Sequence, residues 1–492
     1  MNLASVEFAA FAALLLLIYY RIPPRHQWKL LLAAGTAFYL RAGAAHMGFL
    51  LVTSLTTFLT IQKMEKNKAE AEGKAAAKAK NRKILSFCLL LNFGLLFFCK
   101  ASLLRPHSFL SLGLPFGISF YMFQTTGYVI DVYRDKAEGE PDFFRFHLFA
   151  SFFPLLVQGP ICRYGQLAPQ LFAEHKFDSK TVSFGLQRML WGYFKKLVIA
   201  DRIAPAVTAL RGVEDSGAAF FLLTLFYAIQ IYADFTGGID VVLGLSQSLG
   251  IELPENFNLP FFSKNIAEYW RRWHITLGEW MKDYIFFPIS VSSPMRRLNK
   301  FARSRFGDRG KRIPVYIATI VTWAATGIWH GLTPNFLLWG MLNCGIILLS
   351  EELSPLYARF HNRFHLKEKK WYDGVQILRM FLLMNLIRAC DLFPNPMEYF
   401  RRLVTLVTNP NFSALSGVIP LKTLDFGILA FGIMLMTAVS LFQEQGGSVR
   451  RFLWRKGEGL RFAALFALFL LVLLLGSYGV GYEEANFIYN QF

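Results

Sequence analysis

The sequence is poor in cysteine, and it lacks the short motifs of several common enzyme classes. Five cysteines are spread over 492 residues without a CxxC pair, so neither a disulfide framework nor a zinc ribbon is expected. The sequence contains no glycine-rich phosphate-binding loop and no GxSxG nucleophile elbow. We therefore expect buried, unpaired cysteines, no metal and no tightly bound cofactor.

Acidic residues are also scarce, since 33 Asp and Glu oppose 52 Lys and Arg and give a net charge of +19. The basic residues cluster in short loops between long apolar runs, instead of being interleaved with aromatics as in nucleic-acid-binding proteins. Hydrophobic residues make up 54% of the chain, and phenylalanine alone occurs 50 times. This distribution predicts an all-α, polytopic integral membrane protein within a lipid bilayer, and no nucleic-acid partner.

The loop charges predict how the chain is oriented in the membrane. Residues 1–20 carry no basic region and no clear cleavage site, so they are expected to form a first span and not a signal peptide. The basic loops 63–83, 295–312 and 444–461 are expected in the cytoplasm, which places both termini outside. We expect roughly eleven membrane-embedded helices. Because termini on one side require an even number of crossings, at least one helix should be re-entrant or interfacial.

The segment 258–290 contains too many charged residues for a simple span. A continuous helix there would carry two stripes, one of Arg272, Thr276, Glu279 and Asp283 and one of Trp270, His274, Leu277 and Met281. Two interpretations remain open. The helix could lie at the membrane interface, or it could be tucked into the protein and line a cavity.

Two further stretches place polar residues among apolar ones. In 152–172, Gly159-Pro160 should interrupt the helix, and Gln158 and Arg163 are polar, so a broken or re-entrant segment is expected. In 232–245, Asp234 and Asp240 need partners if buried. Arg163, Arg271 and Arg272 are the expected ones, and structural ion pairing is the alternative to a role in catalysis.

The stretch 325–340, ATGIWHGLTPNFLLWG, has the composition of a membrane-spanning helix, yet it contains His330. With Pro314 opening the span on the cytoplasmic side, this residue would lie roughly 24 Å along the helix. An ionisable side chain at that depth suggests a functional site. A lone histidine can equally be a buried core residue, and the residues alone do not decide between the two.

EYWRRWHITLGEWMKDYIF and TGIWHG resemble the two signature regions of the membrane-bound O-acyltransferase family. Three more stretches agree in order and spacing, namely 114–134, 153–170 and 232–261. Together they resemble the branch that contains the membrane subunit of alginate O-acetyltransferase. A protein that transfers D-alanine to teichoic acid is a more distant match.

This resemblance implies helices around a central pore, with spanning helices in 1–110, a catalytic core in 111–350 and further spanning helices in 351–492. It implies that His330 and His274 are catalytic. Imidazole titrates near neutral pH and suits a general base, although His330 could instead accept the acyl group itself. The residues expected to line the pore or support the site are Gln158, Arg163, Asp234, Asp240, Trp270, Arg271, Arg272, Trp273, Asp283 and Trp329.

The reaction implied is transfer of an acetyl group from cytoplasmic acetyl-CoA to hydroxyls of an exported polysaccharide, directly or through an extracytoplasmic acetyltransferase partner. The bacterial cytoplasmic membrane is the expected location. Two alternatives stay open at this point. One is transfer of D-alanine from a carrier protein to a cell-wall polymer. The other is a polysaccharide transporter, which would favour internal inverted repeats that the sequence does not display.

Overall fold

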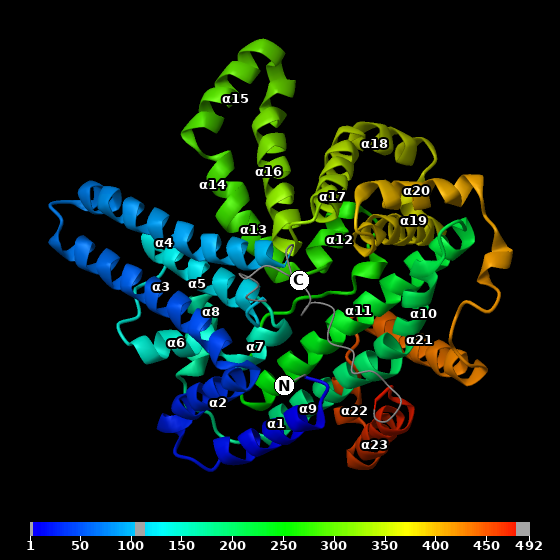
Figure 1. Ribbon diagram of the computed structural model, residues 1–492, viewed down its shortest axis with the longest axis horizontal. Coiled ribbons are helices and arrows are strands. Elements are labelled where there is room, and N and C mark those ends of the chain that lie inside the picture. Colours follow the sequence, from blue (N-terminus) through cyan, green and yellow to red (C-terminus); the bar gives the residue numbers. More distant parts are fainter. Residues whose placement is uncertain (1–2, 104–113, 479–492) are drawn as a thin grey trace. The chain divides into compact units, whose positions relative to one another are not determined.

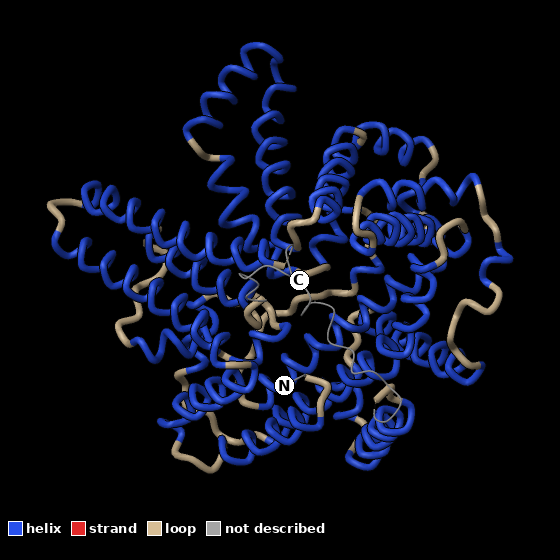
Figure 2. The backbone as a smooth tube through the Cα atoms, in the orientation of Figure 1, coloured by secondary structure: helices blue, strands red, loops and turns tan. Residues whose placement is uncertain are grey.

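The computed structural model describes residues 3–103 and 114–478 (Figure 1). Over these residues the backbone consists of helices and connecting loops, with no named strand (Figure 2). Within these residues an isolated antiparallel bridge joins Phe257 and Trp273. The all-α class expected from the sequence is therefore confirmed for the described part of the chain.

The chain forms two compact units. The first contains the described residues up to Tyr193 together with Gly237–Pro254. Its helices before α11 are α1 (Val6–Tyr19), α2 (Gln27–Ala42), α3 (Ala44–Glu70), α4 (Lys74–Ser102), α5 (Ile118–Tyr133), α6 (Phe143–Ser151), α7 (Phe153–Gln158), α8 (Tyr164–Leu171) and α9 (Ser179–Tyr193). The helix α11 (Gly217–Ser248) contributes residues to both units.

The second unit contains Phe194–Thr236 and the described residues from Glu255 onward. It begins with a π-helical turn, η2 (Phe194–Ala200). Its other principal helices are α10 (Asp201–Gly212), α12 (Ile266–Arg272), α13 (Ile275–Met281), α14 (Phe287–Ser290), α15 (Ser293–Phe306), α16 (Ile313–His330), α17 (Pro334–Glu352), α18 (Ser354–Arg363), α19 (Lys370–Arg388), α20 (Pro396–Thr408), α21 (Thr423–Glu444), α22 (Val449–Arg455) and α23 (Glu458–Leu475). The division into 1–110, 111–350 and 351–492 concerns function and stays a prediction.

Local sequence signals explain where many of these helices start. Side-chain oxygens of Ser5, Asp142 and Asn265 accept hydrogen bonds from backbone N–H groups of the first turns of α1, α6 and α12. These are residue types that favour the N-cap, because they satisfy N–H groups that have no partner within the helix. Helices α14 to α18 each have proline in the first two positions, where its missing N–H costs nothing.

Five described helices are long and apolar enough to cross a membrane, namely α3, α4, α11, α21 and α23. The bent pair α17 and α18, with an angle of 54° between them, would be a sixth. The expected total of roughly eleven embedded helices is not confirmed by this count. The expected placement of both termini outside concerns residues 1–2 and 479–492, which lie beyond the described part.

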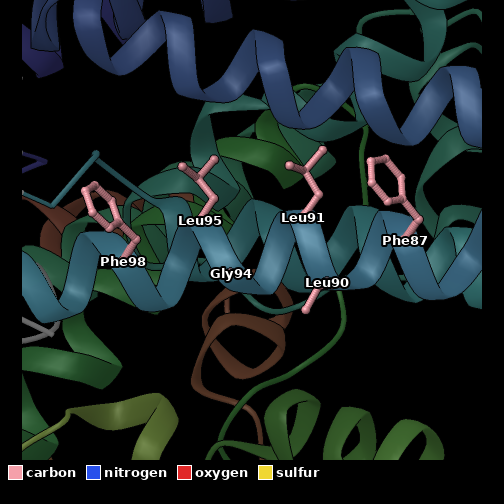
Figure 3. A pocket seen from close by; sticks show the side chains of 6 residues that line it. All are labelled: Phe87, Leu90, Leu91, Gly94, Leu95 and Phe98. Atoms are coloured by element: carbon pink, nitrogen blue, oxygen red, sulfur yellow. The ribbon is translucent and has the colours of Figure 1, made fainter.

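One face of α4 exposes a row of large apolar side chains. Phe87, Leu91, Leu95 and Phe98 lie along this helix and, with Leu90 and Gly94, line a shallow apolar groove (Figure 3). Phe87 is 67% exposed and Leu90 is 74% exposed. Because water-exposed surfaces rarely present contiguous apolar patches, this face is typical of a helix that faces lipid.

Candidate active site

His330 is the last residue of α16, and it lies at a turn and not in mid-helix. The backbone of Gly331 is extended, and α17 starts at Pro334. The expectation that 325–340 forms one continuous spanning helix is therefore wrong. The physical reason is the Gly-Leu-Thr-Pro sequence, since proline favours the first turn of a new helix and disfavours helical backbone at the residue before it.

Two glycines bring α16 and α17 into backbone contact beside this turn. A Cβ atom added at Gly327 would lie 2.5 Å from the carbonyl oxygen of Phe336, and one added at Gly340 would lie 2.5 Å from that of Trp323. Real Cβ atoms do not approach other atoms so closely. Glycine is thus required at both positions, and the close packing fixes the end of α16 where His330 lies.

Aromatic rings surround the imidazole of His330. Its ring centroid lies 4.8 Å from that of Trp329 and 4.9 Å from that of Trp339, both in edge-to-face arrangements. The ring of Phe336 lies parallel to it at 6.3 Å. The side chain is half-buried, so it combines apolar walls with partial access. Such an environment keeps an imidazole in place and strengthens polar interactions with a bound substrate.

His274 lies at a break between α12 and α13, and its φ angle is +48°. Backbone hydrogen bonds to the segment 256–258 stabilise this left-handed conformation. Asn258 donates to the carbonyl oxygen of Arg272 at 2.9 Å, and Ile275 donates to that of Asn256 at 3.0 Å. The break corrects the expected continuous helix over 258–290 and its two stripes, because helical periodicity does not carry across a left-handed residue.

The ring of His274 is buried, with 2% exposure. Its Nδ1 lies 3.3 Å from the side-chain oxygen of Asn256, and Phe235 contacts its ring edge-to-face at 5.0 Å. Burial, assisted by the positive charge of Arg388, lowers the pKa of His274 to about 3. The imidazole is therefore neutral at physiological pH.

Trp329 links the two histidines. Its ring lies 6.1 Å from that of His274 and 4.8 Å from that of His330, and the side chain is buried. The second unit thus brings together the two histidines that are far apart in the sequence. An aromatic side chain that both imidazoles contact is a means of holding them in a fixed relative position.

The tryptophans predicted beside His274 also belong to this cluster. Trp270 lies 5.7 Å from Trp339, which contacts His330. Trp273 is 2% exposed, and the guanidinium of Arg388 lies 4.3 Å from its ring centroid, which is a cation–π geometry. Sequence reasoning missed Trp339 and Arg388. Arg388 lies in LIRACDL (386–392), outside the stretches on which the resemblance was based.

The arginines and the acidic residue predicted around His274 lie differently. Arg272 forms ion pairs with Glu268 at 2.8 Å and Glu444 at 2.7 Å. Arg271 is exposed, and Asp283 is half-buried in the turn that follows α13. The guanidinium of Arg272 thus forms ion pairs within the second unit, including one to a different helix.

The two aspartates of α11 form ion pairs with basic residues other than the arginines expected from the sequence. Asp234 pairs with Lys196 at 2.7 Å, and Lys196 also pairs with Asp201 at 2.8 Å. Asp240 pairs with Arg188 at 2.8 Å. Ion pairing of both aspartates is confirmed, whereas Arg163, Arg271 and Arg272 were the expected partners. The sequence signal was present in FKKLVIAD, where lysines interrupt an apolar run.

Gln158, Arg163 and Asp240 belong to the first unit, whereas both histidines belong to the second. Gln158 ends α7 and is fully buried, and Arg163 is half-buried just before α8. The interruption predicted at Gly159-Pro160 is confirmed, since α7 ends there. A role for these three residues at the site stays a prediction.

This arrangement defines a class of protein, namely a membrane protein with paired histidines in an aromatic setting. Within residues 3–103 and 114–478 no group of three or more His, Cys, Asp or Glu is placed to hold a metal ion. Imidazoles beside an apolar wall suit proton transfer during acyl transfer to a hydroxyl.

Comparison with known proteins identifies the family. The model of the MBOAT, membrane-bound O-acyltransferase, family matches residues 132–392. The chain therefore belongs to the membrane-bound O-acyltransferase family, and it is a multi-pass membrane protein. Both histidines, His274 and His330, lie inside the matched region.

Three relatives show the range of chemistry in related proteins. A probable alginate O-acetylase, AlgI, of Azotobacter vinelandii is 32% identical over 68% of this chain and 66% of its own. A peptidoglycan O-acetyltransferase of Helicobacter pylori is 30% identical over 58% and 54%. A teichoic acid D-alanyltransferase of Bacillus subtilis is 28% identical over 48% and 58%. The alignments thus span about half to two thirds of these relatives.

Proposed function

We propose that this protein transfers acetyl groups from cytoplasmic acetyl-CoA to hydroxyls of an exported polysaccharide, directly or through an extracytoplasmic acetyltransferase partner. The proposal rests on one observation, namely that the ring of Trp329 contacts the rings of both His274 and His330. The names of the alginate and peptidoglycan relatives support acetyl as the acyl group. The bacterial cytoplasmic membrane, with both termini outside, is the proposed location.

In the proposed reaction His330 acts as the general base. Its imidazole takes the proton from the acceptor hydroxyl while the hydroxyl oxygen attacks the thioester carbonyl carbon. The carbon–sulfur bond then breaks, CoA leaves as the thiol after taking up a proton, and the acetyl ester remains on the acceptor. The half-buried position of His330 between apolar rings supports this role, because it allows access to substrate while limiting water.

A second candidate function is transfer of D-alanine from a carrier protein to a cell-wall polymer. The similarity to the Bacillus subtilis teichoic acid D-alanyltransferase favours it. The two candidates use the same chemistry at the histidines and differ in the acyl donor. Supplying membranes with radiolabelled acetyl-CoA or with a D-alanyl carrier protein separates them, since only the true donor labels the polymer.

Substitution of His330 by alanine tests the proposed function. We expect O-acetylation of the exported polymer to be lost while the protein still inserts and accumulates. Loss of a general base costs about 10²–10⁴ in rate. The measurement is the acetyl content of secreted polymer beside the abundance of the protein in the membrane.

His361→Ala is a matched control, because this histidine contacts Tyr372 outside the cluster. It should leave acetylation unchanged. Normal acetylation by His330→Ala at normal abundance would show that His330 is a packing residue and not the base. Failure of the polymer itself to appear outside the cell would instead indicate a transporter.

A further inference from the structure

Asn256 is a fully buried residue that sequence reasoning did not single out. It lies in the loop between Pro254 and Pro260, ahead of α12. Its backbone carbonyl oxygen accepts the N–H of Ile275 at 3.0 Å, directly after His274. Its side chain faces the same turn, where it contacts Thr276 and His274. Main chain and side chain of one residue thus contact His274 and the two residues that follow it.

The contacts of Thr276 determine which way the Asn256 amide points. The backbone N–H of Thr276 lies 3.2 Å from Oδ1 of Asn256, and the Thr276 hydroxyl lies 2.9 Å from the same atom. A backbone N–H can only donate, so the atom facing it must be the amide oxygen. The oxygen and nitrogen of an asparagine are otherwise assigned from their partners, and here the assignment is unambiguous.

The position of this oxygen determines the tautomer of His274. Oδ1 of Asn256 only accepts hydrogen bonds, and it lies 3.3 Å from Nδ1 of His274. Nδ1 must therefore carry a hydrogen. A neutral imidazole has one N–H, so Nε2 carries the lone pair. The depressed pKa of His274 is consistent with this neutral form.

We propose that Asn256 is a positioning residue that holds His274 in the Nδ1–H tautomer, so that Nε2 serves the acyl transfer as a hydrogen-bond acceptor. This inference rests on the proposed function and deepens it. An acceptor nitrogen binds a hydroxyl or amide N–H of a substrate. It cannot polarise a thioester carbonyl, which requires a donor. His274 is thereby assigned to holding a substrate N–H or O–H group, and His330 to the proton transfer.

Two substitutions of Asn256 test the assignment with acetyl-CoA as the donor and a soluble polysaccharide as the acceptor, measuring CoA release by protein in liposomes. Asn256→Asp keeps an oxygen at the same place but introduces a negative charge, which favours the imidazolium. We expect the pH midpoint of His274 itself, followed by nitrogen-15 NMR, to move up by at least one unit while activity at alkaline pH is retained. Asn256→Leu removes the oxygen, and we expect kcat/KM to fall at least tenfold at every pH.

Thr276→Val is the matched control. It removes the hydroxyl bond to the same oxygen and leaves the bond between Asn256 and His274 in place. We expect activity within about twofold of the wild type and an unchanged pH profile. A purely structural role for Asn256 would lower protein abundance without changing the titration of His274. An identical pH midpoint of His274 in wild type and Asn256→Asp would overturn the proposal.

A second measurement does not depend on the folding of these variants or on the acyl donor. Nitrogen-15 NMR of histidine-labelled wild-type protein distinguishes protonated from unprotonated ring nitrogens. We expect a neutral ring with a hydrogen on Nδ1, assigned to His274 by its loss in His274→Gln. A ring with its hydrogen on Nε2 would refute the inference. If wild type releases no more CoA than His330→Ala, the proposed acyl donor is wrong. In that case the tautomer of His274, measured by NMR, still tests the role of Asn256.

Discussion

Substituting Lys196 by methionine should destabilise the protein, because this lysine balances two buried carboxylates. Its side chain is 1% exposed, and those of Asp234 and Asp201 are 2% and 10% exposed. Above pH 7, where all three groups are charged, they carry one net negative charge together. Without the ammonium both carboxylates lose this ion pair and repel each other. Removing one partner from a buried ion pair typically costs about 3–5 kcal/mol, and here two ion pairs are lost together.

The pH dependence of this loss has a definite sign. Burial raises the pKa of Asp201 to about 7, against the attraction of Lys196, and repulsion from Asp234 adds to the rise. A carboxyl group with a raised folded-state pKa binds more protons in the folded protein than in the unfolded chain. Its contribution to stability therefore falls as pH rises from about 4 towards 7. In Lys196→Met the deficit should be largest above pH 7 and smaller near pH 5.

The assay is thermal unfolding of detergent-purified protein, followed by intrinsic fluorescence at pH 5 and pH 8. We expect the midpoint of Lys196→Met to lie several degrees below that of wild type at pH 8. The double variant Lys196→Met/Asp234→Asn should recover part of the loss, since it removes one of the two unbalanced charges. Equal midpoints for wild type and Lys196→Met at pH 8 would refute the reasoning, as would a double variant no more stable than the single one.

Two more outcomes follow from contacts and charges already described. Gly327→Ala should reduce the yield of monodisperse protein in size-exclusion chromatography, because the added Cβ would lie 2.5 Å from the Phe336 carbonyl oxygen, whereas Gly345→Ala, with nothing within 4 Å, should not. Single cysteines at exposed positions 72, 305 and 445 should react with a membrane-impermeant maleimide only after the cytoplasmic face is opened, and the buried native cysteines should contribute little background. Labelling of two of the three positions from outside would contradict the proposed topology.

Composition and short motifs predict the helical class and the family correctly, and they identify His274 and His330 as candidates whose catalytic role stays a prediction. It does not predict the break at His274. RRWHITLGEW has ordinary helical periodicity, and the left-handed turn depends on hydrogen bonds from residues 256–258, which are distant in the chain. Asn256 was missed for the same reason, since a single buried asparagine between two prolines has no local signature. Lys196 was detectable, because an ionisable residue in an apolar run is itself a signal.

The backbone contact between α16 and α17 has a mechanical consequence for the enzyme. Because the two backbones are in direct contact at Gly327 and Gly340, sliding or rotation of one helix against the other would bring backbone atoms into collision there. The pair should therefore tilt as one body when the thickness of the bilayer changes. His330 at its turn moves with Trp339 and Phe336, so the walls of the imidazole pocket travel with the imidazole, and reactivity should depend little on the lipid in which the protein resides.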